Sequence, residues 1–156
     1  MRIDIMTLFP EMCEAVLDTS ILGRARRAGL FEVYCHNIRE YSKEKHQKVD
    51  DAPYGGGSGM ILRADPIFRC YEHICEELCS KPHTIYLSPK GPVLTQQKAV
   101  ALSQNYDNIL LICGHYEGVD ERVLEEIVDE EISIGDFVIT GGELAALVLT
   151  DAVARL

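Results

Sequence analysis

No stretch of this 156-residue sequence approaches the roughly 20 consecutive apolar residues that span a bilayer. The N-terminal residues lack the features of a secretion signal, because Asp4 interrupts the apolar run and no small-residue cleavage site follows. Internal repeats and low-complexity tracts are also missing, and 47% of the residues are hydrophobic. That content suffices for a buried core. We therefore expect one cytoplasmic domain over residues 1–156.

Several common ligand motifs are missing as well. The glycine-rich segment Tyr54–Met60 lacks the Gly-Lys-Ser/Thr ending of a P-loop, and no Gly-x-Gly-x-x-Gly opens a helix. ATP and NAD sites are therefore disfavoured. The sequence has six cysteines but no Cys-x-x-Cys. On a helix Cys75 and Cys79 would share a face while Cys70 points elsewhere, which favours reduced, buried thiols over the alternative of a zinc site.

Basic residues are scarce in the last third of the chain. Residues 101–156 hold 2 Lys/Arg against 12 Asp/Glu, which accounts for the whole net charge of −10. Between Arg24 and Lys48 the balance reverses, with 7 basic and 3 acidic residues. That stretch is either a contact for phosphates or a solvated surface of mixed charge, whereas the acidic composition as a whole argues against a general nucleic-acid binder.

Strand-like and helix-like patterns alternate along the chain, which predicts an α/β fold with a mostly parallel sheet covered on both faces. We expect strands over residues 2–8, 31–36, 83–87, 108–113 and 131–134. We expect helices over 10–17, from a Ser20 cap to Gly29, over 65–79, after a Thr95 cap, from an Asp120 cap to 128, and over 143–155. Residues 38–63 show no clear period, and such a long loop is usually functional or mobile.

Glycines follow the predicted strands in the second half of the chain. These are Gly91, Gly114, Gly118, Gly135, Gly141 and Gly142. Ligands of open α/β sheets bind beyond the carboxyl ends of strands, and glycine lets the backbone approach a ligand closely. The segments 88–92, 113–118 and 134–143 are therefore predicted to line one small-molecule pocket.

Five segments together resemble the bacterial tRNA (guanine-N1)-methyltransferase family, which modifies guanosine 37 beside the anticodon. In chain order they are Leu8–Met12, Val49–Met60, Tyr86–Gly91, Cys113–Arg122 and Ser133–Leu144. The resemblance extends over essentially the whole chain. It implies a SPOUT-type fold with a deep C-terminal trefoil knot, and a homodimer whose active sites are shared between subunits, with loop 50–60 of one subunit facing the knot of the other.

The resemblance also implies S-adenosylmethionine as methyl donor, held bent by the loops of the knot. The cofactor-binding residues would be Tyr86, Leu87, Ser88, Pro89, Gly91, Gly114, Tyr116, Glu117, Gly118, Ser133, Ile134, Gly135, Asp136, Phe137, Val138, Ile139, Gly141 and Gly142. For the apolar members ordinary core packing is the alternative. Glu117 and Asp136 would lie near the amino-acid end or the sulfonium, or else serve as loop caps or solvated charges. Some enzymes of the family depend on Mg²⁺, for which no ligand cluster is evident.

Arg155 matches the family arginine that stabilises charge on guanine O6. The family's general base is an aspartate beyond the end of this chain, as is the tRNA-gripping C-terminal domain, so we expect a truncated enzyme that binds cofactor but is inactive alone. Two positions depart from the family pattern: Ala145 stands where proline is expected, and His115 where arginine is common.

The residues proposed to contact RNA are basic: Arg24, Arg26, Arg27, Lys43, Lys45 and His46. The alternatives to this function are another SPOUT enzyme with a different RNA target, a non-catalytic nucleotide-binding module, and a domain that only dimerises.

Overall fold

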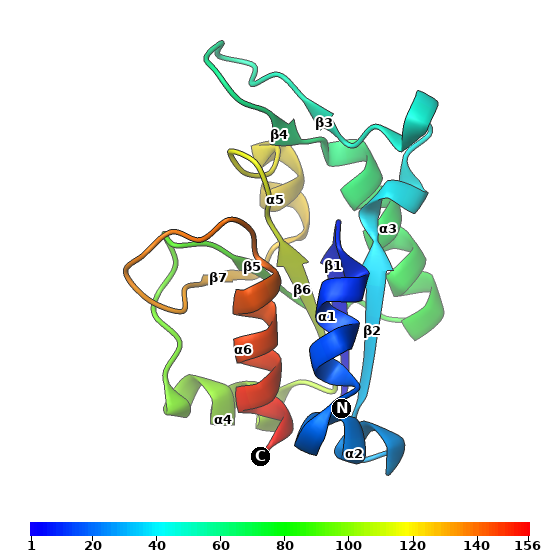
Figure 1. Ribbon diagram of the computed structural model, residues 1–156, viewed down its shortest axis with the longest axis vertical. Helices are drawn as coiled ribbons and strands as arrows, with labels where there is room; N and C mark the ends of the chain where they lie inside the picture. Colours follow the sequence, from blue (N-terminus) through cyan, green and yellow to red (C-terminus); the bar gives the residue numbers. More distant parts are fainter.

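A computed structural model describes residues 1–156, and its centre is a five-stranded sheet in the order β2-β1-β6-β5-β7. The strands are β1 (Arg2–Thr7), β2 (Glu32–Asn37), β5 (His83–Leu87), β6 (Asn108–Cys113) and β7 (Glu130–Ile132). Every neighbouring pair is parallel, so all carboxyl ends lie at one edge of the sheet. The predicted α/β fold with a mostly parallel sheet is confirmed (Figure 1).

Helices cover both faces of this sheet. They are α1 (Pro10–Leu17), α2 (Ser20–Arg27), α3 (Ala64–Leu78), α4 (Gln96–Asn105), α5 (Glu121–Ile127) and α6 (Glu143–Ala154), with short 3-10 turns η1 (Ile38–Tyr41) and η2 (Lys45–Gln47). In Figure 1, α1 and α6 lie side by side in front of the sheet, and α3 lies behind β2. None of the helices has both the length and the apolar character needed to cross a membrane.

The buried residues of β6 show why this strand reads as a continuous apolar run. Ile109, Leu111 and Cys113 belong to the core that includes residues of α1, α4 and α6. Leu110 and Ile112 belong to the opposite core, with residues of α3 and α5. Side chains alternate between the two faces of a strand, and both faces are buried here, so no position requires a polar residue.

Most helix boundaries follow the predicted local signals. Pro10 occupies the first turn of α1, the Thr95 hydroxyl accepts a hydrogen bond from Lys98 N at 3.2 Å, and Asp120 caps α5 by accepting from Arg122 N at 3.1 Å. The prediction that Ser20 caps α2 is wrong, because Thr19 is the capping position and Ser20 begins the helix with a φ of 52°. Gly29, with a φ of 70°, follows the end of α2 as expected.

The region 38–63, for which the sequence predicts an irregular loop, contains a small hairpin. Its strands β3 (Asp50–Asp51) and β4 (Ile61–Leu62) pair antiparallel and are joined by residues 52–60. In Figure 1 the hairpin projects beyond the carboxyl edge of the main sheet. Each strand has only two residues, which is too short for an alternating pattern to be visible in the sequence.

A buried carboxylate lies on the central strand β1. Asp4 is fully buried, and its Oδ1 lies 2.8 Å from Arg2 Nη2 and 2.7 Å from His36 Nε2 on β2. Arg2 also contacts Glu77 of α3 at 2.7 Å. Burial opposes ionisation of Asp4, but the hydrogen bonds from His36 and Arg2 lower its pKa below the ordinary value. Ionised Asp4 therefore stabilises the packing of β1, β2 and α3.

We predict that Asp4→Asn lowers the free energy of unfolding by about 2 kcal/mol at pH 7, because a buried ion pair loses one partner while Arg2 keeps access to solvent. Since the folded-state pKa lies below the unfolded value of about 3.9, this contribution is complete above about pH 4 and is lost as the pH falls further. Urea titrations at pH 7 and pH 3 measure both effects.

The matched control is Asp18→Asn. Asp18 also pairs with an arginine, Arg26, at 2.7 Å, but its side chain is 63% exposed. Its loss should change the free energy of unfolding by less than about 0.5 kcal/mol. An Asp4→Asn effect no larger than that of the control, or one that does not shrink at pH 3, would contradict the assignment.

Candidate functional site

The loops that follow β5, β6 and β7 meet at the carboxyl edge of the sheet and enclose a cavity of about 350 Å³. These three strands are adjacent in the sheet order. The lining consists of residues 86–90, 114–119, 121, 124, 131–134, 137–142 and 145. The cavity therefore lies where open α/β sheets usually bind ligands.

Backbone hydrogen bonds join these loops to one another. Ser88 N donates to Ile132 O at 3.1 Å, and Leu94 N donates to Ser133 O at 2.7 Å. The Ser133 hydroxyl donates to Gly135 O at 2.8 Å, which closes a tight turn. The wall of the cavity is therefore held largely by main-chain contacts, which fix the positions of its free N–H and C=O groups.

Two glycines allow chain segments to come into direct backbone contact. A Cβ atom on Gly142 would lie 2.6 Å from Cys113 Cα, and Gly142 N donates to Gly114 O at 2.9 Å. A Cβ on Gly91 would lie 2.6 Å from the carbonyl carbon of Glu131. These glycines are required because the segments after β5 and before α6 pass directly against β7 and β6.

The structure brings most of the predicted cofactor-binding residues around this one cavity. All of them line it except Gly91, Gly135 and Asp136. Gly91 faces the backbone of Glu131, so its role in the structure is chain packing. The segments 88–92, 113–118 and 134–143, which are far apart in the sequence, each contribute residues to this one cavity, as the positions of the glycines predict.

The lining combines backbone polar groups, apolar side chains and carboxylates. Glu117, Glu121 and Glu131 all line the cavity, with Lys90 as the one ammonium group. Burial raises the pKa of Tyr86 to about 12, so its hydroxyl stays protonated at neutral pH and can donate a hydrogen bond. Such a lining suits a small molecule that has a flat apolar part, polar edges and a positive charge.

Several lining residues were not among the predicted cofactor-binding residues, and of these His115 is the most distinctive. Its ring packs edge-on against Phe9 at 5.3 Å and Tyr116 at 4.8 Å, and its Nδ1 is buried without a hydrogen-bond partner. Nearby, Glu143 is buried and accepts a hydrogen bond from the Thr7 hydroxyl at 2.7 Å. The sequence offers two signals for His115: its place in the predicted pocket segment 113–118, and its departure from the arginine that is common at this position.

Arg155 lies away from this cavity within the chain. It follows the last turn of α6, is exposed, and is not part of the lining. The other end of α6 begins at Gly142 in the cavity wall, and a 12-residue helix is about 18 Å long. Figure 1 shows the chain terminus at the opposite end of α6 from the loops. A catalytic role for Arg155 stays a prediction, and it requires that Arg155 reach the cavity of a second subunit.

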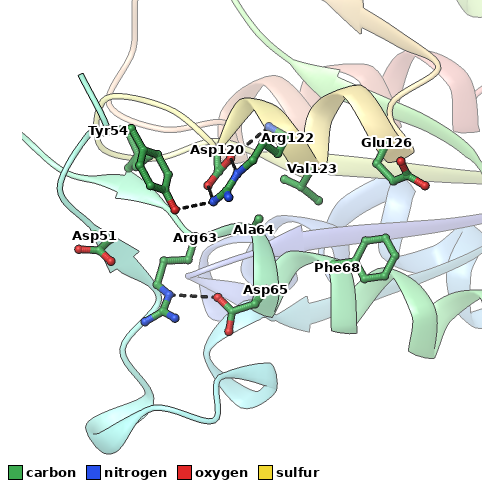
Figure 2. Close-up of a pocket in the computed structure, with 11 residues that line it drawn as sticks. Asp51, Tyr54, Arg63, Ala64, Asp65, Phe68, Asp120, Arg122, Val123 and Glu126 are labelled. Carbon is green, nitrogen blue, oxygen red and sulfur yellow. Dashed lines mark hydrogen bonds and ion pairs between the residues drawn. The ribbon is translucent and has the colours of Figure 1, made fainter. Parts of the chain in front are cut away.

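A second cavity, of about 660 Å³, lies between the β3–β4 hairpin and helices α3 and α5 (Figure 2). Tyr54, Arg63, Phe68 and Arg122 are among its lining residues. It adjoins the first cavity through the segment 115–122, which pairs with the hairpin: Glu117 N donates to Met60 O, and Leu62 N donates to Gly118 O, both at 2.9 Å. The hairpin is thus fixed to a wall of the first cavity.

The predicted basic contact residues do not form one surface. Arg26 donates to Glu14, to Asp18 and to the backbone of Val33, so it ties α2 to α1 and β2. Lys45 and His46 belong to η2, and Lys43 lies two residues before it. Figure 1 places this segment at the opposite end of the molecule from α2. Nowhere in residues 1–156 do three or more His, Cys, Asp or Glu side chains form a group suited to a metal ion.

Together the fold and the first cavity define a parallel α/β domain with a small-molecule pocket formed by loops at the carboxyl ends of three adjacent strands. Comparison with known proteins identifies its family. Residues 1–156 match the family described as tRNA (Guanine-1)-methyltransferase TrmD, and the chain belongs to that family.

Known relatives are similar over the whole of this chain. A tRNA (guanine-N(1)-)-methyltransferase of Ruminiclostridium cellulolyticum is 55% identical over 156 residues, and one of Oceanobacillus iheyensis is 54% identical. The chain spans 66% and 63% of the lengths of these two proteins. A crystal structure of tRNA (m1G37) methyltransferase from Aquifex aeolicus is 41% identical, with a TM-score of 0.91, and the match covers 100% of this chain and 69% of that one.

We predict that Gly142→Ala lowers the free energy of unfolding by about 1–3 kcal/mol, because the added Cβ forces Gly142 away from the backbone of Cys113. Gly55→Ala is the matched control, since nothing lies within 4 Å of a Cβ at that position and its φ is not in the left-handed region. Urea denaturation compares the two variants. Equal stabilities would show that the close approach at Gly142 does not constrain the fold.

Proposed function

We propose that this chain binds S-adenosylmethionine and that the protein transfers its methyl group to N1 of guanosine 37 in tRNA. The observation that carries the proposal is the cavity of about 350 Å³ formed by the loops after β5, β6 and β7, in a chain of the tRNA (Guanine-1)-methyltransferase family. The similar crystal structure is named for the same position of tRNA.

The residues around the cavity fit this cofactor chemically. Main-chain N–H and C=O groups of the three loops can read the edge of an adenine, while Leu87, Ile134 and Ile139 offer apolar contacts to its faces. A carboxylate favours a nearby positive charge, and Glu117 is our candidate to face the sulfonium. When bound, S-adenosylmethionine supplies an electrophilic methyl group.

Methyl transfer to guanine N1 requires alignment of the two reactants, a base for the N1 proton and stabilisation of charge on O6. The guanidinium of Arg155 is suited to the last role, because it is planar and always charged. Since Arg155 lies at the far end of α6 from the cavity of its own chain, we propose that it serves the cavity of a partner subunit. The general base and further tRNA contacts are proposed to lie in sequence beyond residue 156.

An exposed apolar stripe supports a homodimer. Met12 and Val16 of α1 and Leu144 and Val148 of α6 are each 41–49% exposed, although they are large and apolar. Each pair is spaced four residues apart, and α1 and α6 lie side by side, so the four side chains can form one patch (Figure 1). Patches of this kind commonly mark an interface, and a twofold dimer would bury the stripe against its own copy.

Several finer features of the proposal come from the family resemblance alone. They are the trefoil knot of the C-terminal chain, the cytoplasmic location, the approach of loop 50–60 to the knot of the partner, and Mg²⁺ dependence, for which we propose no site.

We predict that this chain binds S-adenosylmethionine in preference to ATP or NAD and transfers little or no methyl group to tRNA by itself. Isothermal titration calorimetry with each ligand, and a radiolabelled methyl-transfer assay, measure the two properties. Preference for ATP or NAD would support a nucleotide-binding module instead, and saturation by none of the three ligands would support a domain that only dimerises.

The same calorimetric titration, carried out on a variant, tests the role of the Glu117 carboxylate. Glu117→Gln should weaken binding of S-adenosylmethionine about three- to tenfold, because the sulfonium loses a nearby negative charge, and leave S-adenosylhomocysteine, whose sulfur is neutral, within about twofold. Glu131→Gln is the matched control, because Glu131 also lines the cavity but lies on strand β7. An equal effect of Glu117→Gln on both ligands would show that Glu117 does not face the sulfonium.

For the dimer, we predict that Val148→Glu produces a monomer, because burying the stripe would then also bury an unpaired carboxylate in each subunit. Sedimentation velocity measures the oligomeric state. The control is Leu30→Glu, at an apolar residue that is 74% exposed and lies outside the stripe. A dimer that persists in Val148→Glu, or dissociates equally in Leu30→Glu, would place the interface elsewhere.

A further inference from the structure

The tip of the β3–β4 hairpin carries a strongly exposed aromatic ring. Tyr54 is 80% exposed, and the guanidinium carbon of Arg122 lies 4.6 Å from the centre of its ring. Arg122 Nη2 also donates to the Tyr54 hydroxyl at 2.5 Å. Figure 2 shows the tyrosine hydroxyl directed at this guanidinium, and both residues line the second cavity. The free face of the ring is therefore held in one orientation although it is open to solvent.

The side chain of Arg122 is itself held in place by Asp120. Its Nε and Nη2 donate to the two carboxylate oxygens of Asp120 at 3.0 and 2.7 Å, and Asp120 is nearly fully buried at the start of α5. The hydrogen bonds from Arg122 lower the pKa of Asp120, so this carboxylate stays ionised. An arginine whose side chain is 66% exposed usually samples many rotamers, whereas this one is already ordered.

The charges around the ring favour a neutral partner for this surface. Asp120 neutralises Arg122, while Arg63 is paired with Asp65 at 3.0 Å and with Glu44 at 3.2 Å. Asp51 and Glu126 add negative charge to the same cavity. A phosphate would be repelled by these carboxylates. An uncharged flat ring can stack on the tyrosine without electrostatic repulsion.

Positive charge lies nearby on the same end of the molecule. Lys43, Lys45 and Lys48 are exposed and take part in none of the ion pairs of the structure. Between them His46 and Gln47 have φ values of 61° and 53°, a conformation that is costly for residues with side chains and often marks functional segments. The chain from Lys48 to Tyr54 spans at most about 20 Å.

We propose that Tyr54, held by Arg122, is a stacking platform for an unpaired base of single-stranded RNA whose phosphates contact Lys43, Lys45 and Lys48. Proteins that bind single strands combine aromatic rings that stack bases with basic side chains along the backbone, and this hairpin end offers both. The inference rests on the proposed function, since it concerns how an RNA substrate is held beside the cofactor cavity.

The sequence contains no tryptophan, so a single substitution introduces a specific fluorescent probe. In Tyr54→Trp we expect a 12-nucleotide single-stranded RNA of mixed sequence to quench the fluorescence with saturation, because a base stacks on the indole. Heparin, a polyanion without bases, should not quench it. The matched control is Tyr34→Trp on β2: Tyr34 is 44% exposed and lies under the guanidinium of Arg2 at 4.4 Å, but it is remote from the hairpin. Its fluorescence should not change with RNA.

Affinity measurements separate stacking from charge. Tyr54→Ala should weaken RNA binding about tenfold, and Tyr54→Phe, which keeps the ring, should stay within about twofold. The triple change Lys43→Gln, Lys45→Gln and Lys48→Gln should reduce the slope of log affinity against log salt by about 2, since each lysine contributes about 0.7 with a single strand.

Two results would overturn the inference. One is equal quenching of Tyr54→Trp and Tyr34→Trp by RNA, or none in either. The other concerns the Tyr54→Trp variant without RNA: its fluorescence is protected from quenching by acrylamide, and this protection disappears on dilution. That result would show that a second copy of the chain covers the ring. Calorimetry with S-adenosylmethionine on the same samples distinguishes this failure from that of the proposed function: intact cofactor binding would leave the proposed function standing.

Discussion

The direct contact between the start of α6 and the end of β6 determines how the site of this protein is arranged. Gly142 touches the backbone of Cys113 and is hydrogen-bonded to Gly114, and one residue later the buried Glu143 accepts a hydrogen bond from Thr7 at the end of β1. Because these contacts fix the last helix at the carboxyl edge of the sheet, the loop before it closes over the loops after β5 and β6. A larger residue at position 142 is incompatible with this approach.

The two cavities share a wall, and this joins the proposed cofactor cavity to the hairpin physically. Segment 115–122 lines the first cavity with Glu117 and Gly118, and it presents Asp120 and Arg122 to the second. The hairpin adds its strand β4 alongside this segment through Leu62, which is bonded to Gly118 and Asp120.

Local signals predicted the elements well wherever one strong physical preference dominated. Pro10 starts α1, and the apolar run of β6 is confirmed to the residue. The failures have equally local causes. Ser20 is a favourable cap by residue type, but Thr19 holds that position. The last strand, expected over 131–134, runs over Glu130–Ile132, because Ser133 pairs only through an isolated bridge to Val93.

The sequence by itself determined the α/β class, the parallel sheet and the loops that form the cavity. Strands buried on both faces require apolar residues throughout, and close backbone approach after a strand requires glycine, so both features can be recognised from residue type. Only the tertiary structure decided which of these residues meet. It assigned Gly91 to packing against Glu131, separated Arg155 from the cavity of its own chain, and set Tyr54 over Arg122. Such pairings depend on contacts between segments distant in the sequence, and no local preference of a residue encodes its distant neighbour.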